Sequence, residues 1–520
     1  MKEFKLRGVL SAVSGALLIS AGSTAMADST SDLLNALVAK GVLTEEEAAP
    51  LMKGHEVETQ KKNSEITASF KDGIVFQNGD KSAILQVGGR VQTDYRAYSN
   101  GASNKTTNAL LATGNTSANQ EADTFDIRRA RIEIKGQFYD AYSFLVSENL
   151  TGSNGNASAS LDQAWFNIAW WKEAQFRFGQ FKAPMNLEKM TSSNFMDFQE
   201  RSFVNQLAPN EERGAMFWGL PTTGVTYALS ATTGNGQNNS NRDTRVDGLE
   251  WTGRGTVNFA EIMGNKDAVY HIGAAASYVK IPKSGNSNPN INGTNATQLL
   301  SGTNALRTEP RGINFLTLPN INNIAGVNND IERTRYGLEA AVAQGPFKFQ
   351  AEWLRNKFKG DVSPTQNFDN NLDAWYVEAL WLITGEHYAD AYKDGAFGNI
   401  RPKNDFAHPA AWASGAYGAW ELGVRYSKLD AKDFCNMATG TKATGTTCKS
   451  GFSAAGVTPI SLNNFTLEAD TWTGQLKWIL NANSRIMLDY AYTSFDNPIQ
   501  ISNKYEDSER AITARAQWNF

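Results

Sequence analysis

Basic side chains alternate with apolar ones in the stretch RRARIEIKGQF, residues 128–138. In an extended strand, successive side chains point to opposite faces, so one face here is apolar. The opposite face carries three basic residues, Arg129, Arg131 and Lys135. A guanidinium group binds phosphate oxygens through two parallel hydrogen bonds and stays charged at every working pH. The pattern therefore predicts a strand with one face toward an apolar environment and one face able to meet anions.

The same alternation places further arginines on the polar face of other segments. Arg90 lies opposite Val87 and Val91, and Arg177 lies opposite Phe176 and Phe178. Acidic residues share this polar face, namely Asp94, Glu133, Glu339, Glu352, Glu378 and Glu421. Each arginine can therefore either bind a passing anion or pair with a carboxylate and brace the wall.

Period-two segments recur from about residue 81 to the end of the chain, and we count sixteen of them. They are 81–96, 123–138, 141–150, 161–171, 174–182, 211–220, 223–232, 247–260, 266–281, 331–343, 346–358, 372–384, 417–430, 466–480, 484–496 and 508–520. Most are long enough to cross the apolar part of a bilayer as tilted strands, which takes about 9–11 residues. The fold class predicted is therefore all-β, a transmembrane antiparallel β-barrel of about sixteen strands with inward-folded loops and a short N-terminal helical segment.

The links between these segments alternate between long and short, as expected when outer loops alternate with tight periplasmic turns. Segments 359–371 and 497–507 count among the long outer links, and Tyr139-Asp140 is a tight one. Segment 183–210 follows an early strand and is placed to fold into the lumen. Segment 385–416 is long where a short turn belongs, which indicates either a fold into the lumen or a further hairpin.

The two ends of the chain carry export signals. Residues 1–27 have a basic start, an apolar stretch and the cleavage motif Ala25-Met26-Ala27, and so are predicted to be a signal peptide. Residues 28–65 are predicted to be a periplasmic helical segment, either a spacer or a short coiled coil, with Thr44 and Glu47 as a capping box. Residues 66–520 then form the outer-membrane barrel, and its last strand ends on Phe520 at period two with Trp518 and Ile512.

Composition excludes several other functions. The formal net charge of -4 gives no support for a nucleic-acid partner. Four histidines with no zinc-ligand spacing predict no metal site, and no cofactor motif is recognised. Export to an oxidising compartment favours a disulfide between Cys435 and Cys448.

Several blocks of the sequence resemble the phosphate-selective porin O and P family. They are GGRVQTDY (88–95), FDIRRARIEIKG (125–136), GQFKAPMNLEKMTSSNFMDFQERS (179–202), LITGEHY (382–388) and GAWELGVRYSKLD (418–430), in that order. The resemblance implies a trimeric barrel of the Gram-negative outer membrane, with a basic constriction and arginines along the lumen wall. By this resemblance Lys182, Lys189, Arg201 and Arg213 flank or occupy the inward loop, and Arg129, Arg131 and Arg177 are candidate wall arginines. The resemblance also implies that 385–416, with Lys393, Arg401 and Lys403, folds into the pore.

The sequence therefore predicts a passive pore for small anions, with phosphate or polyphosphate as the leading candidate, embedded in outer-membrane lipid as a homotrimer. No catalytic set is predicted. The alternatives left open are a general porin without selectivity, a non-conducting barrel that serves as an adhesin through its long loops, and a barrel hydrolase. The hydrolase needs a nucleophile beside a base, and the histidines have no evident serine partner.

Overall fold

The computed structural model describes most of the chain. The described residues are 29–70, 73–99, 123–152, 157–234, 249–282, 299–300, 304–322, 324, 327, 330–441, 445, 447–453, 455–462, 464–501 and 504–520. The predicted signal peptide, residues 1–27, lies outside them. No helix among the described residues is long and apolar enough to cross a membrane.

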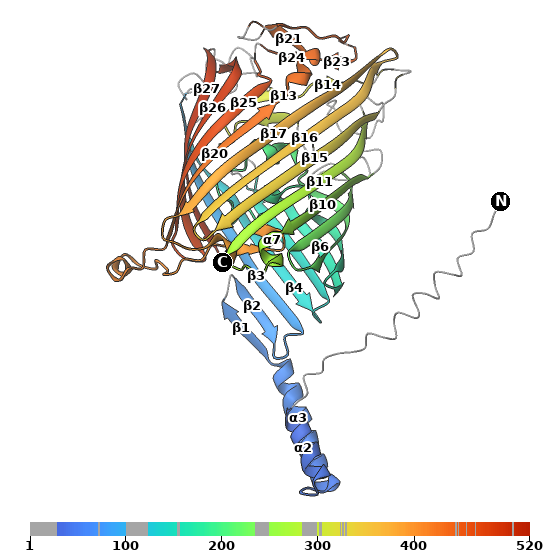
Figure 1. The fold of residues 1–520 in the computed structure, drawn as a ribbon, viewed down its shortest axis with the longest axis vertical. Helices are drawn as coiled ribbons and strands as arrows, with labels where there is room; N and C mark the ends of the chain where they lie inside the picture. The colour runs from blue at the N-terminus through green and yellow to red at the C-terminus, as the bar shows by residue number, and fades with distance from the viewer. Residues whose placement is uncertain are drawn as a thin grey trace, which may run out of the picture. The chain divides into compact units, whose positions relative to one another are not determined.

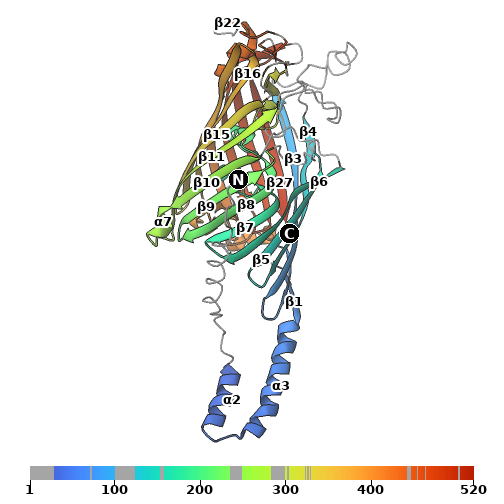
Figure 2. The ribbon, with the colours of Figure 1, turned by 90° about the vertical axis from the view of Figure 1, so that its right-hand side faces the viewer.

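The N-terminal unit contains two helices, α2 (Ser29–Ala39) and α3 (Glu45–Ser64), which lie side by side (Figure 2). The predicted capping box at the start of α3 is confirmed. The Thr44 amide donates to Glu47 Oε2 over 2.9 Å, and the Glu47 amide donates to Thr44 Oγ1 over 3.2 Å. These hydrogen bonds satisfy backbone donors at the helix start and lower the pKa of Glu47. Two short strands follow, β1 (Ile66–Phe70) and β2 (Ile74–Asn78).

Sixteen antiparallel strands form a closed barrel (Figure 1), as predicted. They are β3 (Ala83–Ser99), β4 (Thr124–Phe138), β5 (Tyr142–Thr151), β6 (Ala157–Trp171), β7 (Ala174–Lys182), β8 (Glu211–Thr222), β9 (Val225–Thr232), β10 (Glu250–Asn258), β11 (Ala268–Pro282), β15 (Asp330–Gln344), β16 (Phe347–Ser363), β17 (Gln366–Leu382), β20 (Ala419–Asp430), β25 (Glu468–Ile479), β26 (Ser484–Ile501) and β27 (Lys504–Asn519). The barrel closes where β27 pairs with β3.

The closing seam depends on the last residue and on a glycine. Phe520 and Gly89 exchange backbone hydrogen bonds of 3.1 and 2.8 Å. A Cβ on Gly89 would lie 2.3 Å from the Arg131 carbonyl oxygen and 2.7 Å from the Phe520 ring. Only glycine therefore lets the last residue close against the first barrel strand.

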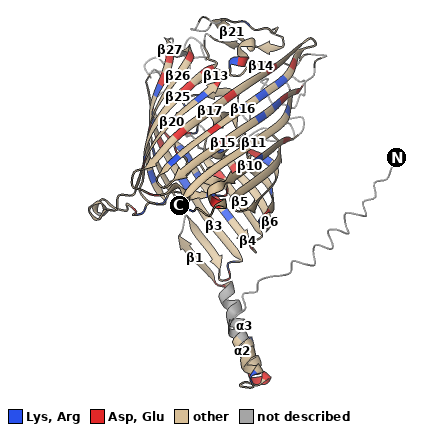
Figure 3. Cartoon of the chain, viewed as in Figure 1, with Lys and Arg blue, Asp and Glu red and all other residues tan. Residues whose placement is uncertain are grey.

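The side chains alternate across the barrel wall as the period-two pattern predicts. On β16, Phe347 and Phe349 are 48% and 58% exposed on the outside, whereas Lys348 and Gln350 are buried inside. Figure 3 shows that Lys, Arg, Asp and Glu are interspersed along the barrel strands.

Two of the predicted long links are wrong. Strands β16 and β17 extend to Ser363 and from Gln366, so the predicted outer link 359–371 is a tight hairpin. Strands β26 and β27 likewise extend to Ile501 and from Lys504, within the predicted link 497–507. Residues 359–361 and 366–371 are mostly polar, so hydrophobic alternation does not mark them as strands. In β26 the ladder is irregular between Ser494 and Ile499, and Pro498 lies in this stretch. The predicted tight turn at Tyr139-Asp140 is correct: both residues have positive φ (52° and 51°), and the Ala141 amide donates to the Phe138 carbonyl over 3.1 Å.

Candidate functional site

The segment between β7 and β8, residues 183–210, crosses the lumen as predicted. It contains two short helices, α5 (Leu187–Met190) and α6 (Phe203–Leu207). Asn186 Nδ2 donates to Glu352 on β16 over 2.8 Å, and the Gln199 amide donates to Asp489 on β26 over 2.9 Å. Arg90 on β3, which is separated from β26 only by β27, donates to Ser193 Oγ over 2.7 Å. The segment thus leaves the wall at β7, is fixed to β16, β26 and β3, and narrows the lumen.

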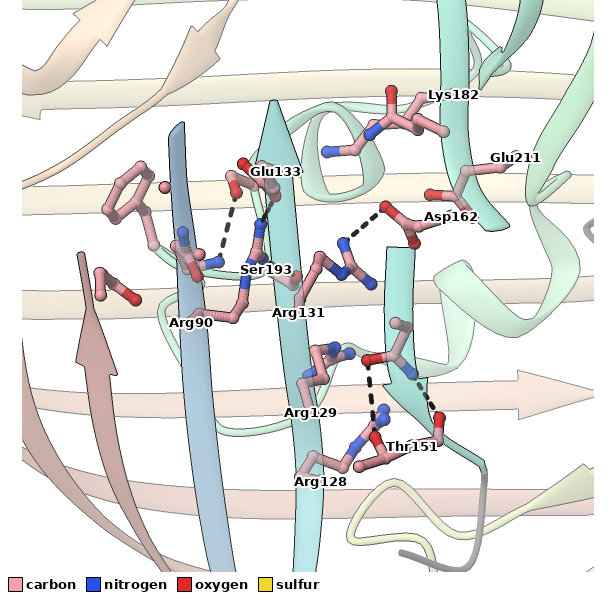
Figure 4. A pocket seen from close by; sticks show the side chains of 18 of the residues that line it. Arg90, Arg128, Arg129, Arg131, Glu133, Thr151, Asp162, Lys182, Ser193 and Glu211 are labelled. Atoms are coloured by element: carbon pink, nitrogen blue, oxygen red, sulfur yellow. Dashed lines mark hydrogen bonds and ion pairs between the residues drawn. The ribbon is translucent and has the colours of Figure 1, made fainter. Parts of the chain in front are cut away.

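A cavity of about 1040 Å³ lies between this segment and the wall formed by β3 to β8 (Figure 4). Ten basic residues line it: Arg90, Arg128, Arg129, Arg131, Lys135, Lys182, Lys189, Arg201, Arg307 and Arg311. Three acidic residues line it: Glu133, Asp162 and Glu211. The cavity therefore has a strong excess of positive charge in a chain whose formal net charge is negative.

The three acidic residues are each paired with a basic one. Arg90 pairs with Glu133, Arg131 Nη1 lies 2.5 Å from Asp162 Oδ2, and Lys189 Nζ lies 3.2 Å from Glu211 Oε2. The half-exposed Lys135 also approaches Glu133, at 3.4 Å. The three lining carboxylates are thus engaged by Arg90, Lys135, Arg131 and Lys189, four of the ten basic residues.

Three basic residues of the cavity have only neutral hydrogen-bond acceptors. Arg129 Nη1 donates to Gln92 Oε1 over 2.7 Å. Lys182 Nζ donates to the carbonyl oxygens of Met190 and Thr191, both over 3.1 Å. Arg201 donates to the carbonyl oxygens of Glu188 and Thr191 over 3.0 and 2.9 Å. Within the described part of the chain, none of these three residues forms an ion pair, so no carboxylate there competes with an anion for their donor groups.

A β-bulge brings Arg128 into the cavity beside Arg129. Strict alternation would place Arg128 on the outer face, and the sequence did not identify it as a site residue. In the structure, Gln92 pairs with Arg129 and Thr93 pairs with Ile127, so Arg128 is an extra residue on β4. Its guanidinium binds both carboxylate oxygens of Glu200, over 2.6 and 3.1 Å.

Burial changes the ionisation of residues on the inward segment. Burial lowers the pKa of Lys189, although Glu211 acts in the opposite direction. Burial alone would raise the pKa of Glu200, but Arg128 and Arg515 outweigh it and hold that pKa well below its usual range. Glu200 therefore stays ionised as a partner for arginines.

Seven of the nine basic residues predicted from the sequence line this cavity: Arg90, Arg129, Arg131, Lys135, Lys182, Lys189 and Arg201. Arg177 is absent from the described lining, because its guanidinium carbon lies 4.1 and 5.0 Å from the ring centroids of Trp165 and Trp218. Arg213 is also absent from that lining, and its Nε donates to Gln180 over 2.9 Å. The sequence missed Arg307 and Arg311, which come from the segment between β11 and β15 and therefore have no strand parity to mark them.

The rest of the lumen wall, from β10 to β27, is also rich in charged residues, but there basic residues and carboxylates more often form ion pairs. Many of its buried basic groups lie against carboxylates, in ion pairs that include Arg254–Glu339 at 2.6 Å, Arg333–Glu250 at 2.8 Å, Arg425–Glu309 at 2.7 Å and Lys477–Glu421 at 2.6 Å. Arg485 on β26 is an exception, because it is buried and donates to the neutral Asn399 Oδ1 over 2.7 Å. We call this side the braced wall and the β3–β8 side the basic wall.

The anomalous segment 385–416 divides into two parts. In the first part, Tyr392 is buried with its hydroxyl 2.7 Å from His271 Nδ1, and the Gly395 carbonyl accepts from Arg254 over 3.1 Å. This part lies on the inner side of the barrel, as the lumen alternative predicted. The second part, which carries Arg401 and Lys403, is largely exposed. Lys393, in the first part, has an 86% exposed side chain.

Cys435 and Cys448 lie in the segment between β20 and β25, and their sulfur atoms are 2.07 Å apart. Cys448 is buried in an apolar core formed by residues of this segment together with Leu316 and Leu318.

A closed sixteen-stranded barrel with an apolar outer face and a charged lumen defines an outer-membrane porin of a Gram-negative bacterium. The profile of the family "Phosphate-selective porin O and P" matches residues 85–520. The chain belongs to this family.

Individual relatives have low sequence identity to the chain. The chain is 26% identical over 400 residues to Porin O of Pseudomonas aeruginosa, covering 74% of this chain and 81% of that protein. Among solved structures, it is similar to the anion-selective porin from Comamonas acidovorans, with 11% identity and a TM-score of 0.48 over 84% of this chain and 100% of that one. It is also similar to the outer membrane channel DcaP of Acinetobacter baumannii, with 11% identity and a TM-score of 0.47 over 84% and 98% of the two chains.

Proposed function

We propose that this chain is a passive pore for small anions with a preference for phosphate. The observation that carries the proposal is the composition of the cavity, where ten basic residues face three acidic ones. Arg129, Lys182 and Arg201 have the strongest case as anion ligands, since their described hydrogen-bond partners are neutral oxygens. The family description agrees with this choice of substrate.

The mechanism requires no energy source. Basic residues raise the local concentration of anions in the lumen. Inside the cavity, guanidinium and ammonium donors replace part of the hydration shell of the anion. Passage also requires weak binding, so that the anion leaves on the other side. The carbonyl oxygens already bound to Lys182 and Arg201 hold these donors in place and compete with the anion, which keeps its binding weak.

Planar-bilayer recordings of the purified protein test the proposal. We expect the reversal potential in a KCl gradient to show chloride as the more permeant ion. We also expect low concentrations of phosphate to block the chloride current, because a doubly charged anion with several acceptor oxygens competes for the same donors.

Two other outcomes would replace the proposal. A weakly selective current without phosphate block would make the protein a general porin. A folded protein with no conductance would favour the adhesin.

Four structural expectations accompany the proposed function. We propose that the signal peptide is removed after Ala27, that the helical segment 28–65 lies in the periplasm, and that the barrel forms a homotrimer in outer-membrane lipid. We propose further that Cys435 and Cys448 form a disulfide in the exported protein. Mass spectrometry of the intact protein with and without reductant tests the first and last of these, and light scattering in detergent tests the trimer.

A further inference from the structure

An exposed, uncharged lobe leaves the barrel between β17 and β20. From Phe406 to Tyr417 the sequence FAHPAAWASGAY contains no Lys, Arg, Asp or Glu. Its short 3₁₀ helix spans Pro409–Ser414, and Trp412 and Tyr417 are 47% and 41% exposed. We call residues 406–417 the aromatic lobe. In Figure 1 it projects outward beside the C-terminus. Exposing contiguous apolar surface to water is unfavourable, and such surfaces usually mark contacts with a partner or a membrane.

Both ends of the aromatic lobe are fixed to the barrel by hydrogen bonds. The Phe406 amide donates to the Leu480 carbonyl over 2.7 Å, and the Gly418 amide donates to the Asn404 carbonyl over 3.1 Å. The Trp478 indole donates to the Tyr417 carbonyl over 2.8 Å. These bonds attach both ends of the lobe to the rim of the barrel.

The rings of the lobe pack against the outer face of the barrel. Phe406 lies 4.8 Å and Trp412 lies 6.3 Å from Trp478, measured between ring centroids. Trp478 stacks in turn on Trp420, its partner across β20 and β25, at 5.1 Å. Leu422 and Leu476 follow on the same outward face and are 41% and 36% exposed. The lobe therefore continues the lipid-facing wall beyond the rim of the barrel.

The lobe lies at the end of the barrel where the strands are joined by tight turns, because it links β17 to β20 at the same end as the 139–140 turn. In outer-membrane barrels this end faces the periplasm. The membrane layer there is the headgroup region, which prefers tryptophan and tyrosine since their rings are apolar with one polar edge. Irregular backbone is tolerated in this hydrated layer, unlike in the hydrocarbon core.

We propose that the aromatic lobe is a membrane-interface anchor that lies in the phospholipid headgroup layer on the periplasmic side of the outer membrane. Trp412 is the deepest contact, and the Trp420–Trp478 pair joins the anchor to the apolar wall. The anchor fixes the tilt and height of the barrel beside the braced wall. The inference is independent of the anion selectivity of the pore.

Site-directed spin labelling of the full-length protein tests the anchor. No described cysteine is free, so a single new cysteine takes the label alone. Ala413→Cys places a label on the exposed side of the lobe. Lys393→Cys is the matched control, because it lies on the same inter-strand segment but on its lumenal part, with an 86% exposed side chain. Both variants are reconstituted in vesicles of phosphatidylethanolamine and phosphatidylglycerol.

We expect the ratio of collision rates with oxygen and with a water-soluble nickel chelate to be several-fold higher at 413 than at 393. Adding Trp412→Ser should shift the 413 label toward water, while single-channel conductance stays unchanged. Equal, water-like ratios at both positions would overturn the proposal. Strong dipolar broadening at 413, from the label of a second copy, would also overturn it and assign the lobe to a contact between protomers.

Discussion

The basic wall and the braced wall use the same residue types on the same face of the same barrel, but they differ in pairing. On the braced wall, Arg333, Arg425 and Lys477 each lie within 2.8 Å of a carboxylate. On the basic wall, Arg129, Lys182 and Arg201 are held by neutral oxygens. A buried pair neutralises its own field, whereas a basic side chain held only by amide and carbonyl groups has no carboxylate that competes with an anion for it.

The comparison shows that an arginine on the lumen face of a strand is not by itself evidence of an anion site. Charged side chains suit the wall of a water-filled lumen. Where they pair with one another across neighbouring strands, they hold the wall together and do not bind a ligand. What identifies a candidate site is the excess of one sign within one cavity.

The largest effect is expected from breaking the braced wall. In Lys477→Met, Glu421 loses its ammonium partner at 2.6 Å and remains buried, so we expect a loss of about 3–5 kcal/mol in the free energy of unfolding. Urea unfolding in detergent, followed by tryptophan emission, measures it. Lys428→Met is the control, because its pair with Glu468 is longer, at 3.5 Å, and partly exposed, and it should cost about 0–1 kcal/mol. Equal losses of unfolding free energy in the two variants would contradict the distinction between buried ion pairs and partly exposed ones.

The next effect is expected on the basic wall. Arg129→Gln and Lys182→Gln each remove a cation whose described partners are neutral, so stability should change little. Phosphate block of the chloride current should weaken by about ten- to hundredfold per variant, as one hydrogen bond to a charged group contributes about 1.5–3 kcal/mol. Arg254→Gln on the braced wall is the comparison for binding, and there the half-blocking phosphate concentration should stay near that of the native protein. A larger change in Arg254→Gln than in the basic-wall variants would reverse the assignment.

A smaller effect is expected at the bulge. Arg128→Met removes the two-bond partner of Glu200 and leaves that carboxylate nearer to the cavity, with Arg515 still 3.0 Å away. Phosphate block should weaken by about fivefold, roughly 1 kcal/mol. Arg128→Lys keeps the charge but not the two-bond geometry, so its phosphate block should be intermediate between that of the native protein and that of Arg128→Met. If Arg128→Lys matches Arg128→Met, the paired geometry matters and the charge does not.

The smallest effect is expected from pH. Burial lowers the pKa of Lys189 below the ordinary lysine value of 10.5, so its charge is lost at a lower pH than the charge of an exposed lysine. Anion selectivity should therefore begin to decline, as the pH rises, before exposed lysines lose their charge. Reversal potentials recorded at increasing pH detect this decline. In Lys189→Arg the decline should move to higher pH, and an unchanged profile would show that another group is responsible.

Much of the barrel could be predicted from the sequence, because period two fixes the strands wherever one face meets lipid. All sixteen strands lie close to the predicted segments, and parity placed Arg90, Arg129 and Arg131 on the correct face. The errors come from features that parity does not encode. The bulge turned Arg128 inward, the end of β16 is mostly polar, and the end of β26 is interrupted by an irregularity between Ser494 and Ile499. Arg177 lies between two tryptophan rings contributed by neighbouring strands.

Arg307 and Arg311 show a second limit. They reach the cavity from an inter-strand segment, so their position depends on how that segment packs inside the barrel and not on local pattern. The φ of Arg311 is 65°, a backbone conformation that non-glycine residues rarely adopt, and sequence patterns do not forecast it.

The location of a bound anion tests the central claim most directly. A crystal of the protein soaked in bromide, measured at the bromine absorption edge, shows where anions reside in the lumen. Our account predicts the strongest lumenal bromide peak in the cavity of the basic wall, within reach of Arg129, Lys182 or Arg201, and its loss when phosphate is added. A strongest peak beside the ion pairs of the braced wall, with an empty basic-wall cavity, would contradict it.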